Sequence, residues 1–416
     1  MRTNCPQSLL IVGPLLIVAS LLACQSAMAQ SYGVELHNNL MPASGAMGGA
    51  SFTRPQDLQS AINGNPATMR QFHGPTFGFG GVLIEPTYNV TQTSSLPLLG
   101  VDPYSGKSNA PAALGGNIGV IHQAEIMERP VSFGLGFMTN AGLAVDFRHI
   151  PESNGTHASY LALDLVNGVA LDLTPHLTIG ASLAVGTSIL DGPFVQSSSS
   201  QTDYAPRFTL GANYDLGGGT SIGGFWQSKK ELTFENVVRF ASGPRANTYQ
   251  DIDLDHPMNV GFGIANRCLM DGRLLLAADV LYKNWDDATF FRALYKDQWA
   301  FQFGAQYIAS QRLKLRLGYA FNEDPTRDAV PGTIGGVIPV GGIPAVEYVQ
   351  GQFAAIAQHR LTGGVGITDL VPNMNFDVTL GGVFENEKSF GDTTAELDGY
   401  FVAFGFTFTR PNCCRR

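Results

Sequence analysis

The chain has 416 residues and a formal net charge of −9, with 34 Asp and Glu against 25 Lys and Arg. This acidic balance disfavours nucleic acid as a partner, because nucleic-acid binding requires a basic surface. Charged residues make up only 14% of the chain, whereas a soluble domain usually has about a quarter. Together with 49 glycines and 10% aromatic residues, the composition favours a sheet with one face in lipid and the other facing a polar or partly filled lumen.

Residues 1–29 are predicted to be a cleavable export signal. Arg2 supplies the positive start, residues 9–24 are almost wholly apolar, and residues 27–29 form the small-x-small sequence Ala-Met-Ala. Lipidation of Cys24 is an alternative to cleavage after residue 29. An uncleaved membrane helix is disfavoured, because spanning needs about 20 apolar residues and Pro14 interrupts this run.

Residues 30–71 show no strand alternation and are rich in Gly, Ala, Asn and Met, with a short helix expected at Pro55 to Ile62. A disordered lead-in is one interpretation of such an N-terminal arm. The segment is lightly charged, however, and it contains seven large apolar residues: Leu40, Met41, Met47, Phe52, Leu58, Ile62 and Met69. These favour a hatch that plugs the lumen of a barrel.

Fourteen segments with period-two alternation follow the hatch, which predicts an all-β fold, a 14-stranded antiparallel transmembrane β-barrel over residues 72–408. They begin near residues 75, 112, 131, 158, 176, 205, 219, 251, 272, 298, 311, 358, 374 and 398. Six tight connections alternate with seven long polar ones. Short turns on the periplasmic side and long loops outside are typical of outer-membrane barrels.

The alternation also assigns side chains to faces. On the strand from residue 311, Leu315, Leu317 and Tyr319 are expected to face outward, and Lys314 and Arg316 inward. The last strand has an apolar face that ends in aromatic residues: Tyr400, Val402, Phe404, Phe406 and Phe408. Such an aromatic end is typical of outer-membrane barrels. Residues 409–416 are expected to form a periplasmic tail.

Several motifs resemble the FadL-type long-chain fatty acid transporters, a family that includes importers of aromatic hydrocarbons. In the hatch these are Gly33–Leu36, Ser44–Ala50 and the triplet Asn65, Pro66 and Ala67. The barrel continues the resemblance at Pro75–Pro86, Asn140–Phe147 and Leu315–Phe321, the last followed by Asp324. The resemblance runs in order along essentially the whole mature chain.

The resemblance implies a barrel closed by an N-terminal hatch, with apolar substrates leaving sideways through a kink in the third strand. The kink maps onto five residues: Phe137, Met138, Asn140, Gly142 and Leu143. Sideways exit keeps an apolar molecule in lipid, which is worth about 0.8 kcal/mol per CH₂. One family feature is missing, because the inward position that is basic in the fatty acid transporter lies near Ile189, with no Arg or Lys alongside.

Four inward-facing residues are candidates for binding a polar end of the substrate: Asp279, Gln302, Lys314 and Arg316. Arg316 is the candidate for a substrate carboxylate, through charge-assisted hydrogen bonds. A charge-paired lumen wall is an equal interpretation of these residues. Asn65 of the hatch is a candidate partner for backbone groups freed at the kink, because its amide can both donate and accept.

Other polar residues give weaker signals. Asp251, Asp253 and Asp255 alternate, but they lack the Gly turn and the distant Glu of a calcium loop, so a solvated rim is expected rather than a metal site. The histidines have no Ser or Asp partner at an informative spacing, which disfavours an enzyme. Cys268, Cys413 and Cys414 lack metal-site spacing; a periplasmic disulfide and unpaired thiols both remain open. No cofactor is expected.

The expected function is uptake of long-chain fatty acids, alkanes or aromatic hydrocarbons across the outer membrane of a Gram-negative bacterium. Expected partners are these hydrophobic molecules, outer-membrane lipids and the barrel-assembly machinery, and the protein is expected to be a monomer. A structural or adhesive barrel is the first alternative. A general-diffusion porin is the second, and the hatch and the few inward charges disfavour it.

Overall fold

The computed structural model describes residues 35, 37–191, 200–239, 247–334 and 342–410. The predicted export signal, Cys413 and Cys414 lie outside these ranges. Cys268 is exposed and makes no disulfide in the described part of the chain.

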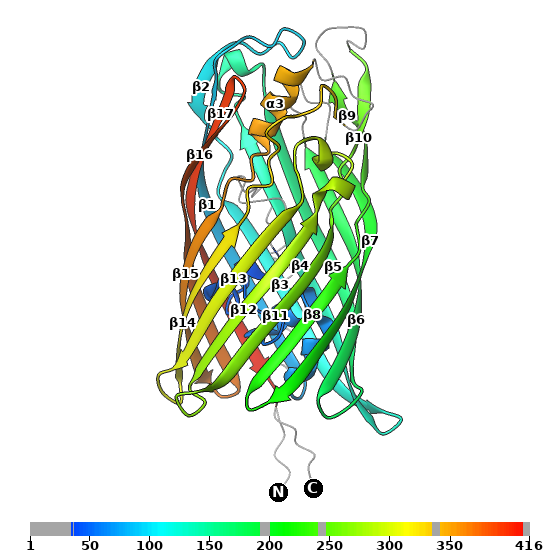
Figure 1. The fold of residues 1–416 in the computed structure, drawn as a ribbon, viewed down its shortest axis with the longest axis vertical. Helices are drawn as coiled ribbons and strands as arrows, with labels where there is room; N and C mark the ends of the chain where they lie inside the picture. Colours follow the sequence, from blue (N-terminus) through cyan, green and yellow to red (C-terminus); the bar gives the residue numbers. More distant parts are fainter. Residues whose placement is uncertain (1–34, 36, 192–199, 240–246, 335–341, 411–416) are drawn as a thin grey trace, which may run out of the picture.

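Fourteen strands of the described residues close into one antiparallel barrel, as predicted (Figure 1). They are β1 (Thr76–Gln92), β3 (Ala113–Ile126), β4 (Arg129–Asp146), β5 (His157–Asp172), β6 (Leu177–Asp191), β7 (Gln201–Gly217), β8 (Thr220–Gln227), β11 (Met258–Leu269), β12 (Leu274–Asn284), β13 (Gln298–Ile308), β14 (Leu313–Asn322), β15 (His359–Val371), β16 (Met374–Phe390) and β17 (Thr393–Thr409). The last strand closes the barrel on the first, from Thr76 opposite Thr409 to Gln92 opposite Thr393.

Three further strands lie outside this ring. β2 (Tyr104–Lys107) pairs with the upper end of β1, while β9 (Thr233–Arg239) and β10 (Tyr249–Asp253) form a separate hairpin. The prediction that the eighth barrel strand begins near residue 251 is therefore wrong. The alternating residues near 251 belong to the hairpin strand β10, where Ile252 is buried among apolar side chains. The barrel strand β11 begins at Met258.

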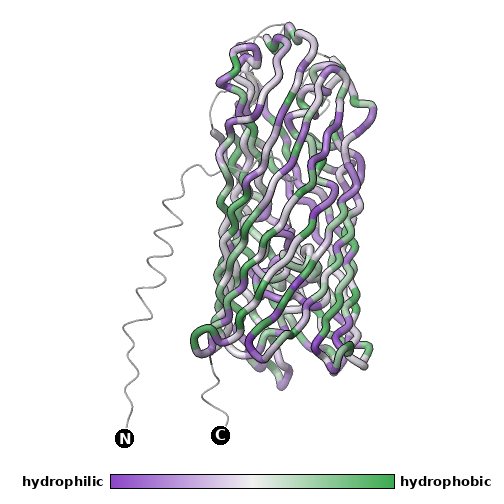
Figure 2. Tube along the Cα trace, turned by 90° about the vertical axis from the view of Figure 1, so that its left-hand side faces the viewer, coloured by the Kyte–Doolittle hydropathy of each residue, from purple (hydrophilic) through white to green (hydrophobic). Residues whose placement is uncertain are grey.

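Hydrophobic and hydrophilic residues alternate along the strands (Figure 2). Leu315, Leu317 and Tyr319 are exposed on β14, whereas Arg316 is buried, as the alternation predicted. On the last strand, Tyr400, Phe404 and Phe408 are exposed. Apolar side chains that alternate with inward residues form the surface that a barrel presents to the hydrocarbon core of a membrane.

Residues 37–71 lie inside the lower part of the barrel as short helices (Figure 1). These are η2 (His37–Leu40), η3 (Gly45–Met47), α2 (Leu58–Asn63) and η4 (Pro66–Gln71). Asp57 caps α2 by accepting a hydrogen bond from the Ser60 N–H, and its other oxygen accepts from the Ala43 and Ser44 N–H groups. One carboxylate thus satisfies three backbone donors of the hatch.

The hatch packs on the wall through apolar side chains and through close backbone contact. Leu58, Ile62 and Met69 form a buried cluster with Met138 of β4. On the opposite side, a Cβ atom added at Gly318 of β14 would lie 1.9 Å from the Gly48 backbone nitrogen of the hatch. Only glycine permits this approach, so the hatch fits against the wall without space for another side chain.

The remaining helices belong to the connections at the upper end. They are η5 (Pro151–Ser153), η6 (Trp285–Asp287), η7 (Phe291–Ala293) and α3 (Ile343–Gln352). Among the described residues, no helix is both long enough and apolar enough to cross a membrane.

Removing the hatch should open the barrel without unfolding it, because residues 37–71 supply no strand to the closed sheet. We expect deletion of residues 30–70 to leave a folded barrel and to raise the single-channel conductance in planar bilayers. A conductance as low as that of the full chain would show that these residues do not close the lumen.

Candidate functional site

The ladder between β3 and β4 stops halfway up the barrel. It runs from Ile126 opposite Arg129 to Ile118 opposite Phe137. Above this point residues 113–117 of β3 still pair with β1, and β4 continues to pair with β5 as far as Asp146. Over these described segments the two neighbouring strands share no ladder pairing, so the wall is interrupted.

A β-bulge in β4 coincides with the interruption. The register between β4 and β5 shifts between Thr139 and Ala141, which leaves Asn140 as the extra residue. A bulge bends its strand and re-aims the side chains around it. The kink predicted at residues 137–143 therefore falls where the ladder breaks.

Side-chain hydrogen bonds, with one backbone bond from a loop, replace the ladder at the two ends of the interruption. At the lower end the Thr139 N–H donates to Asn117 Oδ1 (3.0 Å), and the Thr139 hydroxyl donates to the Gly116 carbonyl (3.0 Å). At the upper end the Asp146 N–H donates to Ser108 Oγ (3.0 Å), and the Asn109 N–H donates to the Asp146 carbonyl (2.8 Å). These bonds satisfy backbone groups at the two ends of the interruption.

A cavity of about 20 Å³ lies at the interruption. It is lined both by the inward-facing Ile84 and by Leu114, which is 51% exposed on the outer face. His37 and Leu40 of the hatch and Gly142 of β4 complete this part of its lining. Residues of the inner face, of the outer face and of the hatch therefore meet at this cavity.

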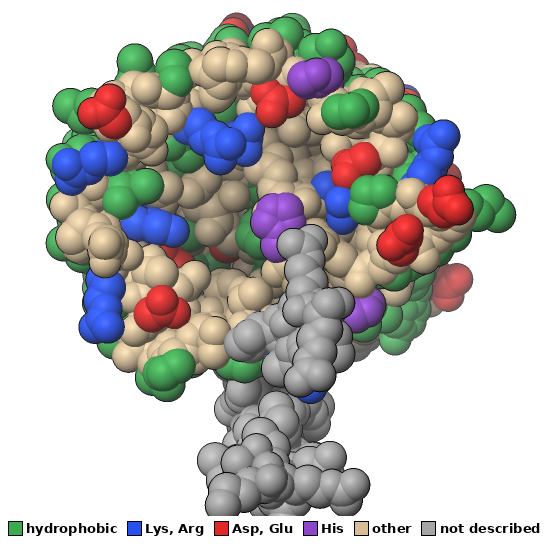
Figure 3. Space-filling view, turned by 90° about the horizontal axis from the view of Figure 1, so that it is seen from below, with side chains coloured by type: hydrophobic (Ala, Val, Ile, Leu, Met, Phe, Trp, Pro, Cys, Tyr) green, Lys and Arg blue, Asp and Glu red, His purple; other side chains and the backbone are tan. Residues whose placement is uncertain are grey.

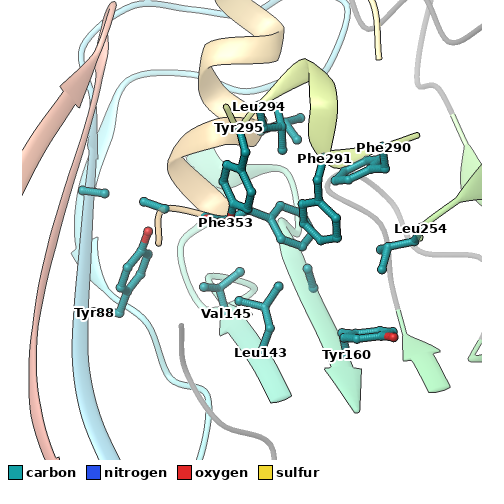
Figure 4. Close-up of a cluster of buried hydrophobic side chains, with 14 of the residues drawn as sticks. Tyr88, Leu143, Val145, Tyr160, Leu254, Phe290, Phe291, Leu294, Tyr295 and Phe353 are labelled. Atoms are coloured by element: carbon teal, nitrogen blue, oxygen red, sulfur yellow. Dashed lines mark hydrogen bonds between the residues drawn. The ribbon is translucent and has the colours of Figure 1, made fainter. Parts of the chain in front are cut away.

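A large apolar cluster fills the upper lumen beside the interruption (Figure 4). The ten residues labelled there are Tyr88, Leu143, Val145, Tyr160, Leu254, Phe290, Phe291, Leu294, Tyr295 and Phe353. They come from β1, β4, β5 and the upper connections, and aromatic contacts join them, such as the stacked Phe291 and Tyr295 rings at 5.2 Å. Leu143 belongs both to the predicted kink and to this cluster.

A buried ion pair adjoins the bulge. Lys230 Nζ lies 2.7 Å from Asp164 Oδ1, and the Asn140 amide donates to Asp164 Oδ2 at 2.6 Å. Lys230 is 1% exposed and approaches Ser188 Oγ at 3.4 Å. The bulge residue is thus held by a carboxylate whose charge is neutralised inside the lumen.

Glu35, at the start of the hatch, is held by a second group of polar side chains. Its carboxylate accepts hydrogen bonds from Arg207 Nη1 (2.7 Å) and Asn259 Nδ2 (2.9 Å) and lies 3.0 Å from His256 Nδ1. Burial alone would raise the pKa of the Glu35 carboxyl. The charge of Arg207 and the contacts with His256 and His37 outweigh burial and hold this pKa well below its ordinary value.

The predicted hatch triplet fixes the hatch to the wall. Asn65 caps η4, with its Oδ1 accepting from the Ala67 N–H, and Pro66 occupies the first turn. The Asn65 amide donates to the carbonyls of Phe52 (2.8 Å) and Ala212 of β7 (2.9 Å). The prediction that Asn65 meets the kink is therefore wrong, because the cap orients its amide toward β7.

The four predicted substrate-binding residues form two pairs rather than one site, with Asp279 opposite Gln302 on neighbouring strands and Lys314 near Arg316 on β14. Asp279 accepts from the Ser51 and Phe52 N–H groups of the hatch (2.6 and 2.8 Å), and Gln302 donates to Asn39 of the hatch.

Arg316 pairs with Asp377 (2.6 Å) and donates to Gln306. Lys314 and Arg316 line a polar cavity of about 220 Å³ at the lower end of the barrel, the end seen in Figure 3. Two of the predicted residues hold the hatch, and Arg316 belongs to a charge-paired wall.

Sequence reasoning missed Lys230. The expectation of no cation beside Ile189 was wrong, since Lys230 lies against the adjacent Ser188. It comes from the connection after β8 and folds back into the lumen, so no spacing on β6 could reveal it. The adjacent Lys229 and Lys230 in a lightly charged chain are the one sequence signal that was available.

The alternating aspartates do not converge. Asp251 accepts from the Asn236 N–H, Asp253 from the Thr233 hydroxyl, and Asp255 pairs with Lys229. Within the described ranges, no group of three or more His, Cys, Asp and Glu side chains is placed to hold a metal ion.

No protein-family model and no curated protein sequence matches the chain. Solved structures share its fold. The Pseudomonas putida toluene transporter TodX is 16% identical with a TM-score of 0.64, over 89% of this chain and 98% of TodX. A Pseudomonas aeruginosa FadL homologue is 13% identical with a TM-score of 0.66, over 92% and 99%. The monoaromatic hydrocarbon channel CymD is 15% identical with a TM-score of 0.61, over 92% and 100%.

These similarities show that the chain has the fold of the FadL-type channels, a 14-stranded barrel with an internal hatch. The fold that the sequence resemblance implied is confirmed.

The contribution of Glu35 to stability should depend on pH in a defined direction. Because folding lowers its pKa, the contribution is fully present above the ordinary value of 4.5 and is lost as the pH falls from there through the folded value. We expect Glu35→Gln to destabilise the protein by about 3 kcal/mol at neutral pH, since it removes one partner of a buried ion pair. The difference in thermal unfolding temperature between the two proteins should vanish at low pH. A difference independent of pH would contradict an ionised Glu35.

Proposed function

We propose that this protein is an outer-membrane transporter that takes up hydrophobic molecules. The observation that carries the proposal is the interrupted wall between β3 and β4 beside an apolar luminal cluster. The apolar outer face suits a membrane, and solved channels with this fold are described as a toluene transporter and a monoaromatic hydrocarbon channel. Fatty acids, alkanes and aromatic hydrocarbons are the candidate substrates.

The proposed route enters the apolar cluster from outside and leaves through the wall. The hatch fills the lumen below, so a straight path to the periplasm is closed. Leaving through the interruption lets an apolar molecule stay in lipid, with a gain of about 0.8 kcal/mol per CH₂ over release into water. Unpaired backbone groups are costly in lipid, and the bonds of Thr139, Asn117 and Ser108 reduce that cost around the opening.

The alternatives explain fewer features. A general-diffusion porin needs an open aqueous lumen, whereas here the hatch packs against both sides of the wall. A structural or adhesive barrel needs no opening between two strands. Neither alternative accounts for a bulge, an interrupted ladder and an apolar cluster at the same place.

The function can be tested by uptake of labelled oleate, hexadecane and toluene into cells that lack their own transporters for these compounds. Expression of this protein should raise the uptake of at least one of them. A folded barrel in the outer membrane that raises none of the three would overturn the proposal.

Closing the interruption with a disulfide should block transport. A Cβ atom at Gly115 of β3 would lie 3.7 Å from the Thr139 Cβ of β4, which suits a disulfide. We expect the Gly115→Cys, Thr139→Cys variant to lose uptake when oxidised and to regain it after reduction.

Each single cysteine variant is the control for the substitutions themselves, because a side chain at Gly115 also approaches Val82 at 2.9 Å. Full uptake with the disulfide verified as closed would exclude this exit and would favour a path through the lower end.

A further inference from the structure

The outer face of the barrel carries a groove of about 520 Å³ far from the interruption. It crosses β11 to β15 within the apolar band. Its lining includes two outward-facing alanines, Ala278 and Ala305, among larger side chains: Ile264, Leu276, Phe303, Leu317, Tyr319 and Leu361.

The strand register explains why the groove forms here. Ala278 of β12 lies opposite Phe303 of β13, and Ala305 of β13 lies opposite Leu276 of β12. The two alanines are therefore diagonal neighbours on the same face. Leu276 and Phe303 are 41% and 48% exposed, so they rise beside the alanines and form the sides of a depression.

An arginine is fixed on the same side of the wall, toward the lower end. Arg273, in the connection between β11 and β12, lies over the Tyr307 ring at 5.0 Å from the ring centroid. Its Nε and Nη2 donate to the carbonyls of Ile308 and Ala309 (3.0 Å each). Tyr307 follows Ala305 by two residues on β13, so the two side chains share one face about 7 Å apart along the strand.

Arg273 is exposed and retains N–H groups that its two hydrogen bonds do not use. Its guanidinium is suited to a phosphate, to which it can donate paired hydrogen bonds. Arg312, in the following lower connection, is also exposed and adds positive charge, while Asp271 in the Arg273 connection opposes it.

We infer that this groove and Arg273 form a binding site for one phospholipid of the periplasmic leaflet, with an acyl chain in the groove and the phosphate on the arginine. The inference rests on the membrane orientation of the proposed function but not on transport. The groove suits a chain because its lining is apolar except for Asn266, and because it faces hydrocarbon. The arginine suits the headgroup because the lower connections lie at the boundary of that hydrocarbon.

Native mass spectrometry of the full protein in mild detergent can test the site. Phosphatidylglycerol and a diacylglycerol with the same chains serve as probes, since only the first carries a phosphate. We expect the unmodified protein to retain one phosphatidylglycerol. Arg273→Gln should lower its retention by about tenfold, the loss expected for a charge-assisted hydrogen bond, while diacylglycerol retention stays the same.

Filling the groove with larger side chains should lower the retention of both lipids. The Ala278→Trp, Ala305→Trp variant should lose phosphatidylglycerol and diacylglycerol alike, and Ala278→Leu serves in its place if the double variant does not fold. Ala181→Trp, at an intermediate-exposure position on β6, is the matched control and should change neither.

Equal retention of both lipids by the unmodified and the groove-filled proteins would overturn the site. A protein dimer that the filled groove abolishes would also overturn it, because a second copy would then be the occupant. Uptake assays are not part of this test, so failure here leaves the proposed transport function standing.

Discussion

The structure depends on one constraint, that backbone hydrogen-bonding groups within lipid must find partners inside the protein. The closure of β17 on β1 meets it around the ring, with pairing along the full length of both strands. Between β3 and β4 part of the ladder is missing, and there the partners are side chains and a neighbouring loop rather than a strand. Such partners can be exchanged without unfolding a strand, which the proposed exit through this wall requires.

Buried charges inside the lumen are under a similar constraint, because each of them also needs partners within the protein. Each of the two buried carboxylates nearest the interruption, Asp164 and Glu35, has a buried cation and further hydrogen-bond donors around it. A lone buried charge would be strongly destabilising, and a satisfied group holds its members in one arrangement. One group fixes the bulge and the other fixes Glu35, the first described residue of the hatch. Both are built from elements that are distant in sequence.

Local patterns in the sequence were sufficient to predict the barrel. Period-two alternation located most strands and their faces, as at Leu317 and Arg316, and the resemblance to the FadL-type transporters indicated the kink in the third strand. Contacts between distant segments were not predictable. Lys230 reaches β6 from another connection, Asn65 is turned toward β7 by its own cap, and Arg207 meets Glu35 across the lumen. The alternation near residue 251 does mark a strand, but a hairpin strand and a barrel strand have the same pattern, so the sequence could not tell them apart.

The contact of Gly48 with Gly318 has a consequence for the order of assembly. The hatch precedes β1, whereas β14 is completed late in the chain, so this contact joins segments made at opposite ends of synthesis. Contacts of such long sequence separation form slowly. β17, which closes the barrel on β1, follows both partners of this contact in the chain. The hatch can therefore be seated against β14 while the sheet is still open, before the last hydrogen-bonded seam encloses the lumen.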